Sequence, residues 1–219
     1  MKEKNLNDRW LIIIILIITT VTAYNSRYTL IPTPPGHTYY SKHNIAILIP
    51  ADLYIWELPI NTDGNIILDG SASISEETGI IGWNERNTNN QRPPPTHNWQ
   101  ESSLIWLKTP PPENPTPHLY YNQLYTYATR NNMILNLTKG ETHPFTHRNH
   151  QGTLQYINYT LHTTDETLQH YGIVACYYCT KTGRTIELFY IDIYNTDPTY
   201  DQAALYNGFK SILDTLHCH

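Results

Sequence analysis

The sequence predicts a mostly β domain that ends in one α-helix. Eighteen tyrosines and many isoleucines and threonines among the 219 residues favour strands, because aromatic and β-branched side chains fit a pleated surface. Short apolar or alternating runs are separated by breaks that contain proline and glycine, as in antiparallel β proteins. Near the C-terminus, residues 199–217 instead show the periodicity of an amphipathic helix.

The first 23 residues predict a signal peptide. A polar stretch that ends at Arg9 precedes the apolar run at residues 10–18, and Val21 and Ala23 suit a signal peptidase. A bilayer requires about 20 apolar residues, so this run is too short to span one. We expect residues 1–23 to be cleaved and the mature protein to be secreted, with an uncleaved signal anchor as the alternative.

The mature chain predicts an arm followed by one domain. Residues 24–40 contain three prolines and a glycine and predict an extended N-terminal arm. Residues 41–219 predict a single β-rich domain, with an Asp63-Gly64 turn and a mostly irregular stretch at residues 70–98. The strands that we expect are at residues 44–49, 53–58, 66–68, 104–107, 119–128, 133–137, 153–163, 171–179 and 186–194.

The C-terminal helix has the clearest local signals. Thr199 and Gln202 form a capping box, and Asp197-Pro198 stands directly before it. The apolar side chains recur with helical spacing and predict one face that packs on a sheet, formed by Leu205, Phe209, Ile212, Leu213 and Leu216.

All three cysteines lie in the last quarter of the chain. In an oxidising compartment we expect two of them to pair and one to be left over. Cys176 and Cys179 are three residues apart on a predicted strand and point to opposite faces, so they do not suit a bond with each other. We therefore expect Cys218 to bond with Cys176 or Cys179. A zinc or redox site at Cys-x-x-Cys would need further ligands.

The net charge limits the class of partner, and two sequence motifs predict glycosylation. The net charge is −5 and no basic cluster exists, which argues against nucleic acid and against anionic membranes as partners after signal cleavage. Asn136-Leu137-Thr138 and Asn158-Tyr159-Thr160 are N-glycosylation motifs, so we expect a glycoprotein modified at Asn136 and Asn158.

The sequence carries no recognised catalytic motif, and we predict that the protein is not an enzyme and uses no cofactor. Asp63 with Asp69, and Asp192 with Asp197, are paired acids, but each pair lies in turns or at strand ends where acids are common. His143, His147 and His150 have the spacing of a metal site on a helix, but Pro144 opposes a helix there. We expect these histidines to lie in a solvated loop and to bind no metal.

Aromatic side chains are the remaining candidates for a binding site. Tryptophan and tyrosine can line an apolar cavity and offer N–H and O–H groups as specificity contacts, or they can fill a β core. The residues that we predict to contact a ligand are Trp83, Trp99, Trp106, Tyr125, Tyr156, Tyr178 and Tyr190.

The segment from Tyr171 to Cys218 resembles the end of a lipocalin. YGIVACYYC and IELFYIDIY resemble the last hairpin of that family, and NTDPTYDQAALYNGFKSILDTL resembles the break and the helix that follow it. Cys218 resembles the cysteine that fastens the helix end. The resemblance, which includes the tick salivary type, implies an antiparallel barrel that binds and sequesters a small apolar or amphipathic molecule. The family's early Gly-x-Trp is represented only by Gly82-Trp83, without the spacer residue.

An immunoglobulin-like β-sandwich is the alternative. HYGIVAC, which ends at Cys176, resembles the D-x-G-x-Y-x-C pattern of a late strand in that fold, with Gly172 in register. Val174 stands where that pattern has tyrosine, and no upstream cysteine exists. This resemblance implies a secreted, immune-modulating protein that binds a host protein.

Overall fold

The structure is a computed structural model that describes residues 33–85, 99–165, 167–193 and 201–218. The chain divides into two compact units, Met1–Pro35 and Gly36–His219. The predicted signal peptide, most of the predicted arm, the capping residue Thr199 and the acid Asp197 lie outside the described residues. No helix within the described ranges is long and apolar enough to cross a membrane.

The second unit is built on one antiparallel sheet of seven strands, in the order β3-β4-β5-β9-β8-β7-β6. Two further strands, β1 and β2, form a separate hairpin. The strands are β1 (His37–Lys42), β2 (Ile45–Pro50), β3 (Leu53–Leu58), β4 (Thr78–Glu85), β5 (Trp99–Lys108), β6 (Ile134–His147), β7 (His150–His162), β8 (Thr167–Cys179) and β9 (Arg184–Ile193).

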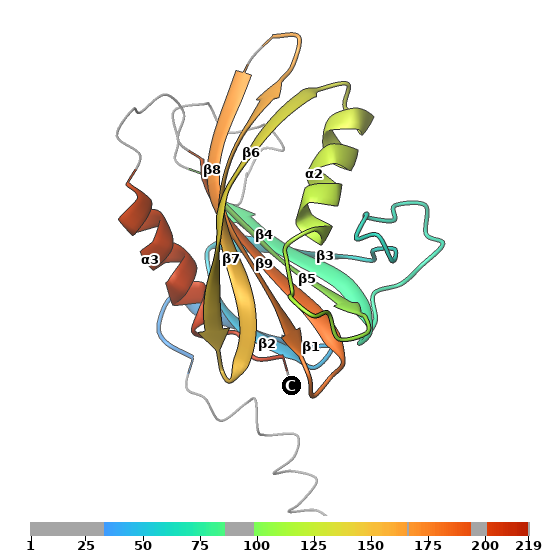
Figure 1. The fold of residues 1–219 in the computed structure, drawn as a ribbon, viewed down its shortest axis with the longest axis vertical. Coiled ribbons are helices and arrows are strands. Elements are labelled where there is room, and N and C mark those ends of the chain that lie inside the picture. Colours follow the sequence, from blue (N-terminus) through green and yellow to red (C-terminus); the bar gives the residue numbers. More distant parts are fainter. Residues whose placement is uncertain (1–32, 86–98, 166, 194–200, 219) are drawn as a thin grey trace, which may run out of the picture. The chain divides into compact units, whose positions relative to one another are not determined.

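Two helices cover opposite faces of this sheet (Figure 1). Helix α2 (Leu119–Arg130) packs on one face, and helix α3 (Gln202–Leu213) packs on the other together with the β1–β2 hairpin. We call these the α2 face and the α3 face. Because side chains alternate along each strand, every central strand contributes to two separate hydrophobic cores.

The predicted mostly β class is confirmed, and the finer architecture differs from the expectation. The hydrogen-bonded order of the sheet ends at β3 and β6, so a closed barrel is not confirmed. Seven of the nine described strands belong to one sheet, which also differs from an immunoglobulin-like sandwich. Two helices, rather than one, lie among the described residues.

The prediction of a strand at residues 119–128 was wrong. These residues form α2, whose buried positions include Tyr120, Leu124 and Ala128, four residues apart and therefore on one helical face. Four tyrosines favoured a strand by propensity, but burial of this face decided the structure.

Several boundaries also needed correction. Strand β1 begins at His37, inside the predicted arm, and β4 lies within residues 70–98, which were expected to be irregular. Strand β6 continues beyond the expected strand at residues 133–137 and contains a register shift between Lys139 and Thr142. The expected return strand at residues 66–68 is reduced to a single bridge between Ile60 and Ile66.

The predicted C-terminal helix is present but shorter than expected. Helix α3 begins after Asp201, whose carboxylate accepts hydrogen bonds from the backbone N–H groups of Ala203 and Ala204. Asp201 therefore acts as the N-cap, in place of the expected Thr199. Leu205, Phe209 and Leu213 are buried, which confirms the predicted apolar face.

The predicted disulfide to Cys218 is confirmed, and its partner is Cys179. It joins the end of β8 to the segment that follows α3, across 39 residues of sequence. Cys176 is a buried free cysteine. Burial, and secondarily the neighbouring Glu187, raise the pKa of its thiol, which keeps Cys176 in the unreactive protonated form.

Candidate functional site

Four of the predicted ligand contacts lie together on the α3 face. Trp83, Trp106 and Tyr190 are buried in its core, and Tyr156 packs against them. Trp106 donates its indole N–H to a backbone carbonyl of the loop before β4, at 2.9 Å. Helix α3 passes so close to the Tyr190 hydroxyl that a Cβ at Gly208 would collide with it. These aromatic side chains contact other parts of the chain and form the core between the sheet, α3 and the β1–β2 hairpin.

The other predicted contacts lie elsewhere. Tyr125 is about half exposed, on the outside of α2. The Tyr178 hydroxyl donates to the backbone carbonyl of Thr109. Trp99 begins β5, and its side chain lies outside the described residues. The seven predicted residues are therefore not gathered at one site.

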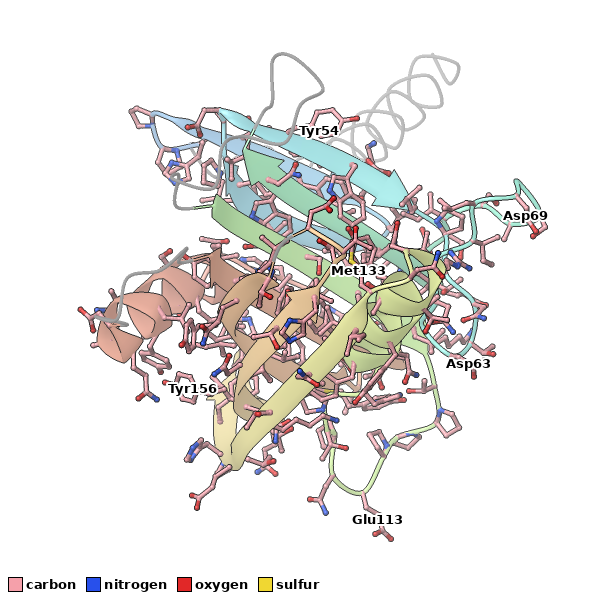
Figure 2. The ribbon with its side chains drawn as sticks, turned by 90° about the horizontal axis from the view of Figure 1, so that it is seen from above. Tyr54, Asp63, Asp69, Glu113, Met133 and Tyr156 are labelled. Atoms are coloured by element: carbon pink, nitrogen blue, oxygen red, sulfur yellow. A yellow bond between two sulfur atoms is a disulfide. The ribbon has the colours of Figure 1, made fainter. Side chains whose placement is uncertain are left out.

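Of the acids considered for catalysis, the described pair, Asp63 and Asp69, does not converge. Figure 2 shows Asp63 and Asp69 at separate positions at the rim of the molecule, with Glu113 on a different loop. The Asp69 carboxylate accepts a hydrogen bond from the backbone N–H of Ser71, which is an ordinary turn contact. Asp192 lies on β9 and its side chain is outside the described residues, as is all of Asp197.

Two of the three histidines expected in a solvated loop are instead buried. His147 ends β6 and His150 begins β7, and both rings lie 5.5 Å from the ring of Tyr177 on β8. His147 Nε2 is 2.8 Å from the backbone oxygen of Leu216. Burial lowers the pKa of both imidazoles, so they are neutral at pH 7. The β6–β7 turn places both rings on the α3 face of the sheet, where they contact Tyr177 of β8. The HPFTHRNH spacing does not reveal this contact with a distant part of the sequence.

Strand β9 places one buried charge on each face of the sheet. On the α3 face, Arg184 is almost fully buried and its guanidinium donates to four backbone carbonyls at 2.7–2.9 Å, those of His43, Asn44, Glu76 and Cys218. Burial lowers the pKa of Arg184. The side chain thereby fastens the β1–β2 turn, the loop before β4 and the C-terminus to one another.

On the α2 face, Glu187 is fully buried at the start of α2. One carboxylate oxygen accepts from the backbone N–H groups of His118 and Leu119, at 2.8 and 3.0 Å, and the other accepts from that of Tyr120, at 2.9 Å. These are donors that a helix leaves without partners in its first turn. Glu187 therefore caps α2 from a distant strand.

A partly exposed apolar region lies on the α2 face, on β6, β7 and β8. The register places Leu135, Leu161 and Leu168 in one row across the three strands. The adjacent row holds Leu137, Tyr159 and His170, and the last two rings stack at 4.6 Å.

Solvent reaches one edge of these rows. Leu135, Leu137, Leu168 and the neighbouring Met133 are only partly buried, whereas Leu161 and Tyr159, on β7 between the two other strands, are buried. We call Met133, Leu135, Leu137, Leu161 and Leu168 the apolar surface. It offers four partly exposed aliphatic side chains around the buried Leu161, with a buried imidazole, His170, at the end of the adjacent row.

Opposite these rows, the outer ends of β6 and β7 carry polar side chains and both glycosylation motifs. Asn136 pairs with Thr160, and Thr138 pairs with Asn158, so each acceptor asparagine stands opposite the threonine of the other motif. The Asn136 side-chain amide lies 3.1 Å from the imidazole of His162. Both acceptors therefore occupy neighbouring positions on one polar sheet surface.

The apolar surface was not predicted from the sequence, although residues 133–138 contain a signal for it. In MILNLT, residues 133–138, Leu135 and Leu137 alternate with Asn136 and Thr138. Since strand side chains alternate between faces, a glycosylation motif on one face implies that these leucines face the other way. The neighbouring strands that complete the surface could be found only from the pairing of β6, β7 and β8.

No protein-family model matches the chain, and no curated protein matches it significantly. Among solved structures, it is similar to cyanobacterial PsbP (CyanoP) from Synechocystis sp. PCC 6803, at 10% identity and a TM-score of 0.45, covering 84% of this chain and 93% of that chain. It is also similar to PA94, a protein of unknown function from Pseudomonas aeruginosa, at 9% identity and a TM-score of 0.30, covering 80% and 95%. Because both TM-scores are below 0.5, the functional argument rests on the residues of this chain alone.

Proposed function

We propose that this chain is a secreted, non-catalytic glycoprotein that binds a small apolar or amphipathic molecule on the apolar surface. The observation that supports this most is the group of partly exposed leucines and Met133 beside α2, at the ends of strands whose opposite side carries polar side chains there. Covering such side chains removes apolar area from water, which is worth about 25 cal/mol per Å². The buried His170 imidazole would give an amphipathic ligand a polar contact.

The lipocalin resemblance places such a ligand inside a closed barrel. We place it instead on the face of the sheet, because the strand order ends at β3 and β6 and because Trp83, Trp106 and Tyr190 pack within the core. The ligand would then lie between α2 and the outer strands β6 to β8.

Two features support the secretory part of the proposal. The Cys179–Cys218 disulfide is of the kind that persists in oxidising compartments. Both glycosylation motifs lie on a sheet surface where Asn136 is exposed and Asn158 is partly exposed. Expression in a secretory host should therefore give a product that loses mass on enzymatic glycan removal, with smaller losses for Asn136→Gln and Asn158→Gln.

Binding is tested with an amphipathic fluorescent probe, 1-anilinonaphthalene-8-sulfonate, and by native mass spectrometry of the protein from the secretory host. We expect the double variant Leu137→Asn/Leu168→Asn to weaken probe binding about 10-fold, because two apolar contacts become polar. Tyr54→Asn is the matched control. Tyr54 is about half exposed and lies on β3, at the opposite edge of the sheet from β6.

Equal loss of probe binding in the double variant and in Tyr54→Asn would overturn the proposal. The alternative predicted from the sequence, an immune-modulating protein that binds a host protein, gives a different result. In that case the native mass spectrum shows a protein complex and no small molecule, and the apolar surface is covered by that partner.

A further inference from the structure

A histidine lies against the disulfide in the core of the α3 face. His150 Nε2 is 3.5 Å from Cys218 Sγ, and the donor atoms of His150, Cys179 and Cys218 all lie within 4.8 Å of one another. All three side chains are buried. They come from the start of β7, the end of β8 and the segment after α3, so the fold assembles them from three distant parts of the chain.

The spacing of the His150 and Cys218 donor atoms suits a tetrahedral zinc ion. With Zn–S bonds of about 2.3 Å and Zn–N bonds of about 2.0 Å, a thiolate sulfur and an imidazole nitrogen on one ion lie about 3.5 Å apart. The observed Nε2 to Sγ distance of 3.5 Å agrees with this value. The two sulfur atoms are bonded to each other in the disulfide, so an ion could bind only after that bond is broken.

The segment that carries Cys218 is held by contacts that do not involve the disulfide. Arg184 donates to the carbonyl of Cys218 and Arg148 to that of Leu216, both at 2.9 Å. His217 and Ala46 exchange two backbone hydrogen bonds, at 2.9 and 2.7 Å. Cys179 lies at the end of β8, paired with Arg184 of β9. Both cysteines should therefore stay near His150 when the disulfide is reduced.

We propose that His150, Cys179 and Cys218 form a redox-gated zinc site, closed to metal in the disulfide state and opened by a dithiol reductant. The reductant transfers two electrons and two protons to the disulfide, which gives two thiols and the reductant's own disulfide. Zn²⁺ then displaces the two thiol protons, which leave to solvent, and two Zn–S bonds form. Two thiolates and one neutral imidazole around Zn²⁺ carry no net charge, which suits a buried site.

The test measures zinc affinity of the full chain in both redox states, by competition with a chromophoric chelator under anaerobic conditions. We expect the reduced chain to bind one zinc ion per chain at least about 100-fold more tightly than the disulfide form. His150→Gln should weaken binding by the reduced chain about 10-fold or more. Cys176→Ser should leave it unchanged, because Cys176 is buried on the other face of β8.

A second measurement covers the case in which His150→Gln or the reduced chain folds poorly. Zinc should shift the thiol–disulfide equilibrium of the wild-type chain toward the thiols, and it should raise the melting temperature of the reduced chain. Three results would each overturn the proposal. They are equal zinc affinity in the two redox states, an equal effect of Cys176→Ser and His150→Gln on that affinity, and a thiol–disulfide equilibrium that zinc does not shift.

Discussion

Arg184 and Glu187 stand three residues apart on β9, so they serve opposite faces of the sheet. The arginine gathers four carbonyls from three segments that are remote in sequence. The carboxylate gathers three consecutive N–H groups of a single helix. One buried charge therefore fastens separate segments together, and the other positions one element.

This contrast explains why a charge is present at each place. Carbonyl groups that end in a buried core need donors, and a guanidinium offers five of them in a planar fork. The first turn of a helix needs acceptors and favours negative charge there. The backbone groups around Arg184 are carbonyls and those around Glu187 are N–H groups, so β9 provides each set with a charge of the complementary sign.

Removing the arginine should have the largest effect. Arg184→Met leaves four carbonyls without a buried donor, and we expect the free energy of unfolding to fall by about 4 kcal/mol. Arg148→Met is the matched control, because Arg148 donates to two carbonyls, those of Leu216 and Asp214, from an exposed position. It should cost about 1 kcal/mol. Denaturant unfolding measures both, and equal losses would show that the Arg184 contacts do not hold the α3 face together.

Removing the carboxylate should have an intermediate effect. Glu187→Gln replaces one acceptor oxygen with an N–H₂ group that faces a backbone donor, and we expect a loss of about 2 kcal/mol. The amide signals of α2 should lose protection from hydrogen exchange more than those of α3. Equal loss in both helices would contradict the role of Glu187 as the cap of α2.

The same variant gives a pH test. Burial raises the pKa of Glu187 above its ordinary 4.5, although the three N–H donors oppose the shift. The folded chain then binds this proton more readily than the unfolded chain, so the contribution to stability is complete below about pH 4.5 and falls as the pH rises above it. The stability difference between wild type and Glu187→Gln should therefore shrink as the pH rises from 4 to 8. A constant difference would contradict the shift.

The smallest effect is expected at His147 on the α3 face. Its pH dependence should run in the opposite direction to that of Glu187. Burial lowers its pKa, so the neutral imidazole contributes stability above its ordinary pKa of 6.5, and that stability is lost as the pH falls. His147→Gln should cost about 1 kcal/mol at pH 8 and less at pH 5. The exposed His143, which lies on the same strand, supplies the control variant His143→Gln. Identical pH profiles for the two variants would contradict the prediction.

The parts of the fold that could be predicted were those whose signals are local. The apolar spacing of Leu205, Phe209 and Leu213 lies within α3, so the helix was found, although its cap is Asp201 rather than the expected Thr199. Helix α2 lacks a side-chain cap of its own and has no acid in its first turn, because its cap is Glu187. A window of sequence around residues 119–128 therefore contains strand-favouring tyrosines but not the group that makes the segment a helix.

The features of the candidate site also divide into those with local sequence signals and those that depend on contacts between distant residues. A disulfide between Cys218 and one of the strand cysteines could be predicted, because side chains alternate along β8 and so Cys176 and Cys179 do not face each other. That the partner is Cys179 depends on the path of the chain after α3. The apolar surface depends on the register of β6, β7 and β8, and the burial of His150 depends on the β6–β7 turn. Neither register nor turn direction is encoded in residue spacing alone.

The distant cap of α2 has a consequence for the order of folding. The hydrogen bonds that Glu187 accepts from the start of α2 join residues 67 to 69 positions apart in the sequence. The hydrogen bond from Arg184 to the carbonyl of His43 joins residues 141 positions apart. During synthesis from the N-terminus, neither core can be completed until β9 has emerged, and closing such long loops is slow. We expect the nascent chain to keep the apolar residues of both faces exposed until then, so a truncation before Arg184 should aggregate rather than form a stable partial domain.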